Sequence, residues 1–103
     1  MPYRYTVTAT FSDASVATEW LDWLKGGHCR DVLNAGAERV EIVQLDGSND
    51  RYDVRYDFPD RNTFELYEKH HAPRLRQDGL ERFPPERGVE YSRSTGTVLF
   101  GED

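Results

Sequence analysis

Two histidines, His28 and His71, are the side chains of this sequence with the most versatile chemistry. Near neutral pH an imidazole can act as a general base, a general acid, a metal ligand or a hydrogen-bond partner. Each histidine lies in the same short pattern: an apolar pair at i and i+3 precedes it, and an apolar residue and a glycine follow it four and eight positions later. The matched positions are Leu21, Leu24, His28, Val32 and Gly36 in the first half and Phe64, Tyr67, His71, Leu75 and Gly79 in the second, 43 residues further on. The pattern predicts a duplicated unit whose two histidines occupy equivalent corners, each at or just beyond a helix end.

Two roles are open for these histidines. As capping groups, the imidazoles would bond the carbonyls at a helix C-terminus, where a protonated ring also interacts favourably with the helix dipole. As polar anchors, they would line a pocket near aromatic side chains, with Arg74 or Arg76 able to hold a carboxylate through two hydrogen bonds. The candidate pocket consists of His28, His71, Trp23, Phe64, Tyr67, Arg74 and Tyr91. The sequence assigns no catalytic residue among them.

Metal binding and nucleophilic catalysis have little support in the sequence. His70 and His71 are adjacent, so on a helix their rings would point about 100° apart and would not share one ion. The sequence contains no cysteine cluster and no His-x-x-x-His pair. The single Cys29 cannot form an internal disulfide, and we expect it to be an inert loop residue. We therefore predict no metal site and no cofactor.

Composition narrows the class of protein and its partners. With 103 residues, including 2 Trp, 6 Tyr and 5 Phe, the chain can form one domain (residues 1–103) with an aromatic-rich core. The net charge of −6 argues against a nucleic-acid or anionic-membrane partner, because both require a basic surface. No apolar run of transmembrane length is present, and residues 1–4 do not resemble the start of a signal peptide. We expect a cytoplasmic protein.

Hydrophobic periodicity predicts four strands and two helical regions. Tyr3–Phe11 alternate apolar and polar side chains, as in a strand with one apolar face. A helical stripe follows until Gly26-Gly27, which we expect to end the helix. The change of parity between Ile42 and Val43 indicates either a β-bulge or burial on both faces. The complete prediction is a strand at 3–11, a helix capped by Ser12-Asp13, a short helix at 30–34 closed by Gly36, a strand at 40–45, a turn at 46–50, a strand at 52–58, a helix from Pro59-Asp60 to Pro73, a charged helix at 74–82, and a strand at 89–100 broken by Gly96.

This order, β-α-β-β-α-β, is that of the ferredoxin-like fold, an α+β class with a four-stranded antiparallel sheet and helices on one face. The opposite face then carries polar residues from two strands, namely Arg4, Thr6, Thr8, Thr10, Arg51, Asp53, Arg55 and Asp57. Two such faces can pair as a dimeric α/β barrel, and a long, exposed last strand favours a homodimer because its edge invites pairing. The alternative is a monomer whose open face carries cross-strand ion pairs.

Three segments resemble a bacterial family of about 100 residues that is catalogued as a domain of unknown function. They are Trp20–Trp23, His28 with Asp31–Leu33 after it, and above all His71–Phe83. The resemblance implies a ferredoxin-like fold within the dimeric α/β-barrel group, which also includes antibiotic-biosynthesis monooxygenases, EthD-like proteins, muconolactone isomerases and haem-degrading enzymes. It implies no reaction and no catalytic residues. Gly26-Gly27 departs from the charged helix-forming residues that the family leads us to expect there.

The leading hypothesis is a small cytoplasmic homodimer that binds or transforms a small organic molecule in a pocket between helices and sheet, without a cofactor. The rival hypothesis is a non-catalytic structural or interaction module with no ligand site. A third is a haem-handling enzyme that uses His71. The sequence does not decide whether the protein is an enzyme.

Overall fold

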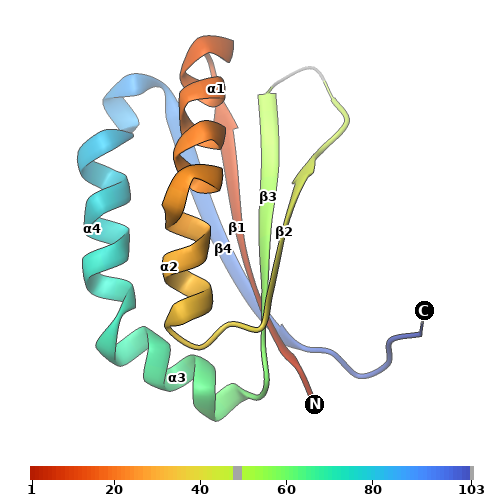
Figure 1. The fold of residues 1–103 in the computed structure, drawn as a ribbon. Coiled ribbons are helices and arrows are strands. Elements are labelled where there is room, and N and C mark those ends of the chain that lie inside the picture. The colour runs from red at the N-terminus through yellow and green to blue at the C-terminus, as the bar shows by residue number, and fades with distance from the viewer. Residues whose placement is uncertain (48–49, 103) are drawn as a thin grey trace.

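A four-stranded antiparallel sheet with helices on one face forms the molecule (Figure 1), as seen in a computed structural model that describes residues 1–47 and 50–102. The spatial order of the strands is β2-β3-β1-β4. Along the chain the elements are β1 (Tyr3–Phe11), α1 (Ala14–Trp23), η1 (Leu24–His28), α2 (Cys29–Asn34), β2 (Arg39–Gln44), β3 (Asp50–Phe58), α3 (Arg61–His70), α4 (Ala72–Arg82), η2 (Pro85–Arg87) and β4 (Val89–Thr97). This arrangement confirms the predicted ferredoxin-like α+β fold.

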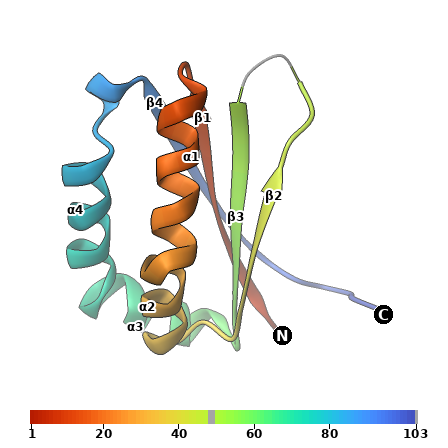
Figure 2. The ribbon, with the colours of Figure 1, turned by 45° about the horizontal axis from the view of Figure 1, so that its top comes forward.

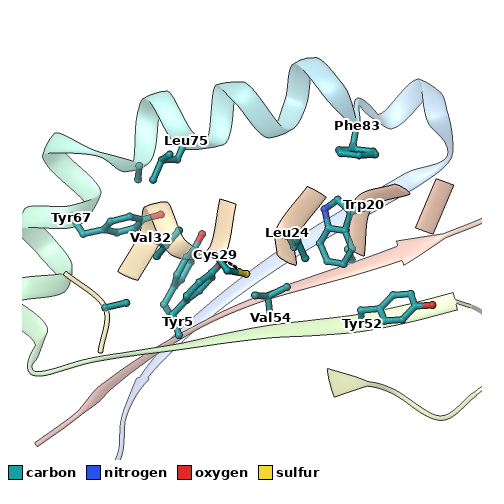
Figure 3. Close-up of a cluster of buried hydrophobic side chains, with 14 of the residues drawn as sticks. Tyr5, Trp20, Leu24, Cys29, Val32, Tyr52, Val54, Tyr67, Leu75 and Phe83 are labelled. Atoms are coloured by element: carbon teal, nitrogen blue, oxygen red, sulfur yellow. Dashed lines mark hydrogen bonds between the residues drawn. The ribbon is translucent and has the colours of Figure 1, made fainter. Parts of the chain in front are cut away.

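The two central strands present an aromatic face to the helices. Alternation along β1 and β3 buries Tyr3, Tyr5, Ala9, Phe11, Tyr52, Val54, Tyr56 and Phe58, each at most 9% exposed. From the other side, Leu75 of α4, Phe83 directly after α4, and Trp20, Leu24 and Val32 between the start of α1 and the end of α2 cover this face (Figure 3). Burial of one large apolar side chain contributes about 1.5–3 kcal/mol, so this layer is the main stabilising element of the fold.

The first helical region does not end at Gly26-Gly27, contrary to the prediction. It continues to Asn34 through η1, a five-residue π-helical segment in which Gly27 alone has non-helical dihedral angles. Glycine costs about 1 kcal/mol in a helix. Cys29 and Val32, both buried beyond the glycines, extend the apolar stripe onto the sheet and offset that cost. His28 therefore lies inside the helical run and not beyond its end.

The second helical region bends where the first is nearly straight (Figures 1 and 2). Helix α3 ends at His70, and His71 has φ −125° and ψ −38° before α4 begins at Ala72. Pro73 lies in the first turn of α4, where its missing N–H costs nothing. His71 thus follows a helix end, as predicted, but the two histidines do not occupy equivalent corners.

The glycines of the repeat also differ. Gly36 follows α2 with φ +132°, whereas Gly79 lies within α4. The duplication therefore describes the order of the elements better than it describes local geometry.

The strands differ from the prediction in three details. The pairing of β2 with β3 runs without interruption from Arg39↔Asp57 to Gln44↔Tyr52, so there is no β-bulge; Ile42 and Val43 are both half-buried instead. Strand β4 ends at Thr97, and Gly96 pairs with Arg4 inside it without breaking it. Ser48 and Asn49, part of the predicted turn at 46–50, lie outside the described residues.

The open face of the sheet carries the polar residues that parity predicted, and several of them are paired. Arg4 lies 2.8 Å from Asp57 directly across β1 and β3, and Thr8 donates to Asp53 at 2.7 Å. Arg55 contacts Asp53 at 3.1 Å. Over the described ranges, none of the helices has the length and apolarity needed to cross a bilayer.

Substitution of two glycines by alanine should have opposite effects on stability. Gly26 is exposed, its Cβ would meet no atom within 4 Å, and its dihedrals are helical, so Gly26→Ala should raise the free energy of unfolding by about 0.5–1 kcal/mol. Gly88 has φ +82°, and a Cβ there would lie 2.1 Å from the Ser12 hydroxyl oxygen. Gly88→Ala should therefore lower the free energy of unfolding by about 1–2 kcal/mol or more. Urea denaturation measures both changes in the free energy of unfolding. A lower value for Gly26→Ala would contradict the helical geometry of Gly26 in η1.

Candidate functional site

A pocket lies between the helices and the helix-facing side of β1, β3 and β4. Its wall is mainly aromatic and comes from Tyr5, Trp20, Trp23, Tyr56, Tyr67 and Tyr91. Its ionisable nitrogen groups are His28, Arg76 and Arg93. Leu80, 42% exposed, and Arg93, also exposed, belong to the lining, so the pocket reaches the surface. The cavity volume is about 60 Å³, room for a few waters, whereas ligand pockets usually measure about 300–1,000 Å³.

The structure brings together four of the seven residues that the sequence placed in a pocket. His28, Trp23, Tyr67 and Tyr91 line this cavity. The remaining three do not. Phe64 is buried in the core, 5.3 Å from the ring of Tyr5, Arg74 is exposed, and His71 is half-buried at the junction of α3 and α4.

His28 and Trp23 form a stacked pair at the boundary of the cavity. Their ring centroids are 4.2 Å apart with an interplanar angle of 22°. The same two side chains also line a separate surface hollow of about 470 Å³, together with Asp31, Asp78 and other residues. Burial lowers the pKa of His28, and the charges of Asp31 and Asp78 oppose that effect only in part. The imidazole is therefore held neutral where it separates two spaces.

As the residues that precede α2 and α4, neither histidine forms a side-chain capping hydrogen bond in the described part of the chain. Capping of C-terminal carbonyls by the imidazoles stays a prediction. His71, the residue of the haem hypothesis, lies outside the lining of this cavity.

Two arginines converge on one phenol at the polar end of the pocket. Arg76 donates from Nη2 to the Tyr5 hydroxyl at 3.1 Å, and Arg93 donates from Nε to the same oxygen at 3.1 Å. Arg76 also forms a salt bridge of 2.8 Å with Glu68. Burial opposes its charge, but the hydrogen bonds to Glu68 and Tyr5 raise the pKa of Arg76 overall.

Sequence reasoning missed part of this cluster. It considered Arg76 beside Arg74, but it overlooked Arg93 and the hydroxyl of Tyr5. Parity was the available signal, because Arg93 pairs with Val7 and must share the helix-facing side with Tyr5.

The buried phenols remain protonated at neutral pH. Burial raises the pKa of Tyr56 and of Tyr67, and it raises the pKa of Tyr91 to about 12 although Arg93 opposes the shift. Tyr91 donates to the carbonyl of Phe83 at 3.0 Å. These three side chains are therefore hydroxyl donors and not phenolates.

Cys29 is not the loop residue that the sequence predicted. It lies at the start of α2, buried, with its Sγ 3.8 Å from the Tyr56 hydroxyl. Burial raises the pKa of its thiol, which disfavours the nucleophilic thiolate. Among the described residues, no three His, Cys, Asp or Glu side chains gather as metal ligands.

Comparison with known proteins defines the class. The chain belongs to the family described as domain of unknown function DUF4286, whose match covers residues 3–93. No curated protein matches the sequence.

Several solved structures share the fold at low sequence identity. A dimeric ferredoxin-like protein from an uncultured marine organism is similar with a TM-score of 0.73 and 15% identity over 98% of both chains. SnoaB, a cofactor-independent oxygenase from Streptomyces nogalater, has a TM-score of 0.71 and 10% identity over 97% of this chain and 95% of its own. A proposed antibiotic biosynthesis monooxygenase from Nitrosomonas europaea has a TM-score of 0.64 and 14% identity over 96% and 91%. At such identities the likeness establishes the fold alone.

The neutral state of His28 should appear in the pH dependence of stability. Because burial lowers the pKa of His28 below its ordinary value of 6.5, the unfolded chain takes up the proton first on acidification. The contribution of His28 to stability is complete above pH 6.5 and is lost as the pH falls from there towards the lowered pKa. His28→Gln should therefore reduce the loss of unfolding free energy between pH 7.5 and 5.5, as measured by urea denaturation. His70→Gln, at an exposed position, is the control, and identical slopes for wild type and His28→Gln would contradict the prediction.

Proposed function

We propose that this protein binds a small organic molecule in the pocket between its helices and its sheet. The observation that supports the proposal is the convergence of aromatic walls with His28, Arg76 and the hydroxyls of Tyr5 and Tyr67 in one cavity. Ligand sites typically combine apolar walls with a few well-placed polar groups.

The small volume of the cavity requires the pocket to widen around a ligand. Trp23 and His28 separate the cavity of about 60 Å³ from the surface hollow of about 470 Å³, so displacement of their stack would join the two spaces. These residues flank Gly26 and Gly27 in the π-helical segment, and such segments occur frequently at functional sites. The pocket also reaches the surface at the exposed Leu80 and Arg93, which leaves room for part of a ligand to extend outward.

The groups present suit proton transfer better than nucleophilic attack. A neutral imidazole can accept a proton, and the phenol of Tyr67, whose pKa burial raises, stays protonated and can donate a hydrogen bond. The thiol of Cys29 has a raised pKa, and its hydrogen-bond partner is the Tyr56 hydroxyl, which is not a base. SnoaB is described as a cofactor-independent oxygenase and has the same fold, which supports a cofactor-independent reaction in this pocket. The alternative is a structural or interaction module, which would bind nothing there.

A cavity-filling variant tests the binding proposal. Val7 is half-buried on β1 and lines the pocket, so Val7→Phe should occupy the cavity. We expect a screen of small aromatic compounds, followed by Trp fluorescence and ligand-observed NMR, to yield ligands of the wild type whose affinity falls at least tenfold in Val7→Phe. Val40→Phe makes the same substitution at a half-buried strand position outside the pocket and should retain binding. Failure of every compound to bind, or equal binding by Val7→Phe, would favour the structural module.

We further propose that two copies pair through their open sheet faces. The chain carries a net charge of −6, yet this face is balanced. Register places on it four arginines (Arg4, Arg39, Arg51, Arg55) and four carboxylates (Glu41, Asp53, Asp57, Glu90). Two copies can therefore approach face to face without the repulsion that the rest of the surface would impose. The marine ferredoxin-like protein is described as dimeric, which supports the association of two copies.

The C-terminal segment extends this interface. It leaves the sheet on the side away from the helices (Figures 1 and 2). Leu99 is 78% exposed and Phe100 is 80% exposed. With Arg4, Thr6 and residues 94–98 they border a hollow of about 550 Å³. Large apolar side chains so exposed are best explained by a partner that covers them.

Light scattering during size-exclusion chromatography tests the homodimer. The wild type should have twice the chain mass of 12.0 kDa. The double variant Leu99→Ser/Phe100→Ser should raise the dimer dissociation constant at least tenfold, because each buried apolar side chain contributes about 1.5–3 kcal/mol. Leu66→Ser, at a 51% exposed position on α3, should leave the dimer unchanged. A wild type of single-chain mass at micromolar concentration would refute the proposal.

A further inference from the structure

The polar end of the pocket contains more hydrogen-bond donors than acceptors. The Tyr5 hydroxyl already accepts from Arg76 and from Arg93, so its own proton remains to be donated. Tyr67 is held protonated by burial. The Nε of Arg76 is buried and has no hydrogen-bond partner among the described residues. Buried donors are normally satisfied, so this site lacks an acceptor.

The charges at this end are also unbalanced. Glu68 is the carboxylate that pairs with Arg76, with an N–O distance of 2.8 Å. Within the described part of the chain, no carboxylate lies within 4.0 Å of the guanidinium nitrogens of Arg93. Two guanidinium groups therefore face one carboxylate, which leaves a local excess of one positive charge in a chain whose net charge is −6.

A second boundary of the pocket has the reverse polarity. Beyond the stack of Trp23 and His28, the surface hollow is lined by Asp31, Asp78 and Glu81, with Arg82 as its single arginine. An anion would thus be repelled on that side and attracted on the side of Arg93. The pocket therefore has one boundary that is negatively charged and another that is positively charged.

From this geometry we propose that the pocket selects small aromatic anions. The anionic oxygens would accept from Arg76, Arg93 and Tyr5, and the ring would lie among Trp23, Tyr67 and Tyr91. This inference rests on the proposed binding function and adds to it the chemical class of the ligand. A carboxylate or phenolate oxygen would accept the unused hydrogen bonds of these donors. It would also supply the negative charge that pairs with Arg93.

Three probes of one shape and different charge test the inference, namely benzoate, benzamide and benzamidinium. We expect benzoate to bind the wild type at least tenfold more tightly than benzamide, because only benzoate can form a carboxylate–guanidinium ion pair with the arginines. Benzamidinium should bind most weakly. Ligand-observed NMR titration measures all three dissociation constants.

Variants then locate the effect. Arg93→Gln leaves the salt bridge between Arg76 and Glu68 intact, and it should weaken benzoate about tenfold while changing benzamide less than twofold. Arg76→Gln should act in the same direction. Arg61→Gln is the matched control, because it removes an exposed arginine that is paired with Glu65 on α3, away from the pocket.

The outcomes separate this inference from the binding proposal. Equal binding of the three probes, or benzoate binding that Arg93→Gln does not weaken, would overturn the selection of anions and leave a neutral binding pocket. If none of the three probes binds while the aromatic screen yields neutral or cationic ligands, the anion inference alone fails. If the screen also yields nothing, both proposals fail.

Discussion

The side chain of Tyr5 joins the core of this protein to its candidate site. Its ring is only 3% exposed and packs with Tyr56 at 5.9 Å, Phe64 at 5.3 Å and Tyr67 at 6.3 Å. Its hydroxyl receives Arg76 from α4 and Arg93 from β4. The guanidinium of Arg76 also lies 5.6 Å from the centre of the same ring. The positions of both arginines therefore depend on the packing of one buried phenol. Because the two long side chains are already held in the folded protein, binding of a ligand would cost less side-chain entropy.

The competition between packing and local propensity explains why the helices take their observed form. Two consecutive glycines would end an isolated helix, but Cys29 and Val32 bury apolar surface only if the helical run continues. The chain resolves the conflict with a wider π-helical turn, which places His28 against Trp23. In the second half the conflict is absent. His71 departs from helical geometry and Pro73 starts a new helix, so the equivalent imidazole is directed elsewhere.

The sequence predicts the fold better than it predicts the site. Alternation in Tyr3–Phe11 and in β3 defines the faces of the sheet, and those faces determine which residues the helices cover. The repeat correctly indicates two β-α-β halves, but it implies a symmetry of His28 and His71 that the backbone does not keep. That symmetry depends on dihedral angles at Gly27 and His71, which spacing alone does not encode. Strand parity also predicts that Arg93 faces the helices. Which of Arg74 and Arg76 faces the pocket depends on the rotation of α4 about its axis, which the sequence does not define.

The parity of the strands also keeps the two proposed surfaces apart. On β1, Tyr5 faces the helices and Thr6 faces the open side, and on β4 the neighbours Arg93 and Ser94 divide in the same way. A partner on the open face would contact Thr6 and Ser94 without touching the pocket side chains, since the sheet lies between them. Polar substitutions on the open face can thus alter association without altering the arginine cluster. Tyr5 does not allow such a separation of effects. The aromatic layer that positions its hydroxyl also holds the helices on the sheet, so a change of that ring would disturb the fold and the site together.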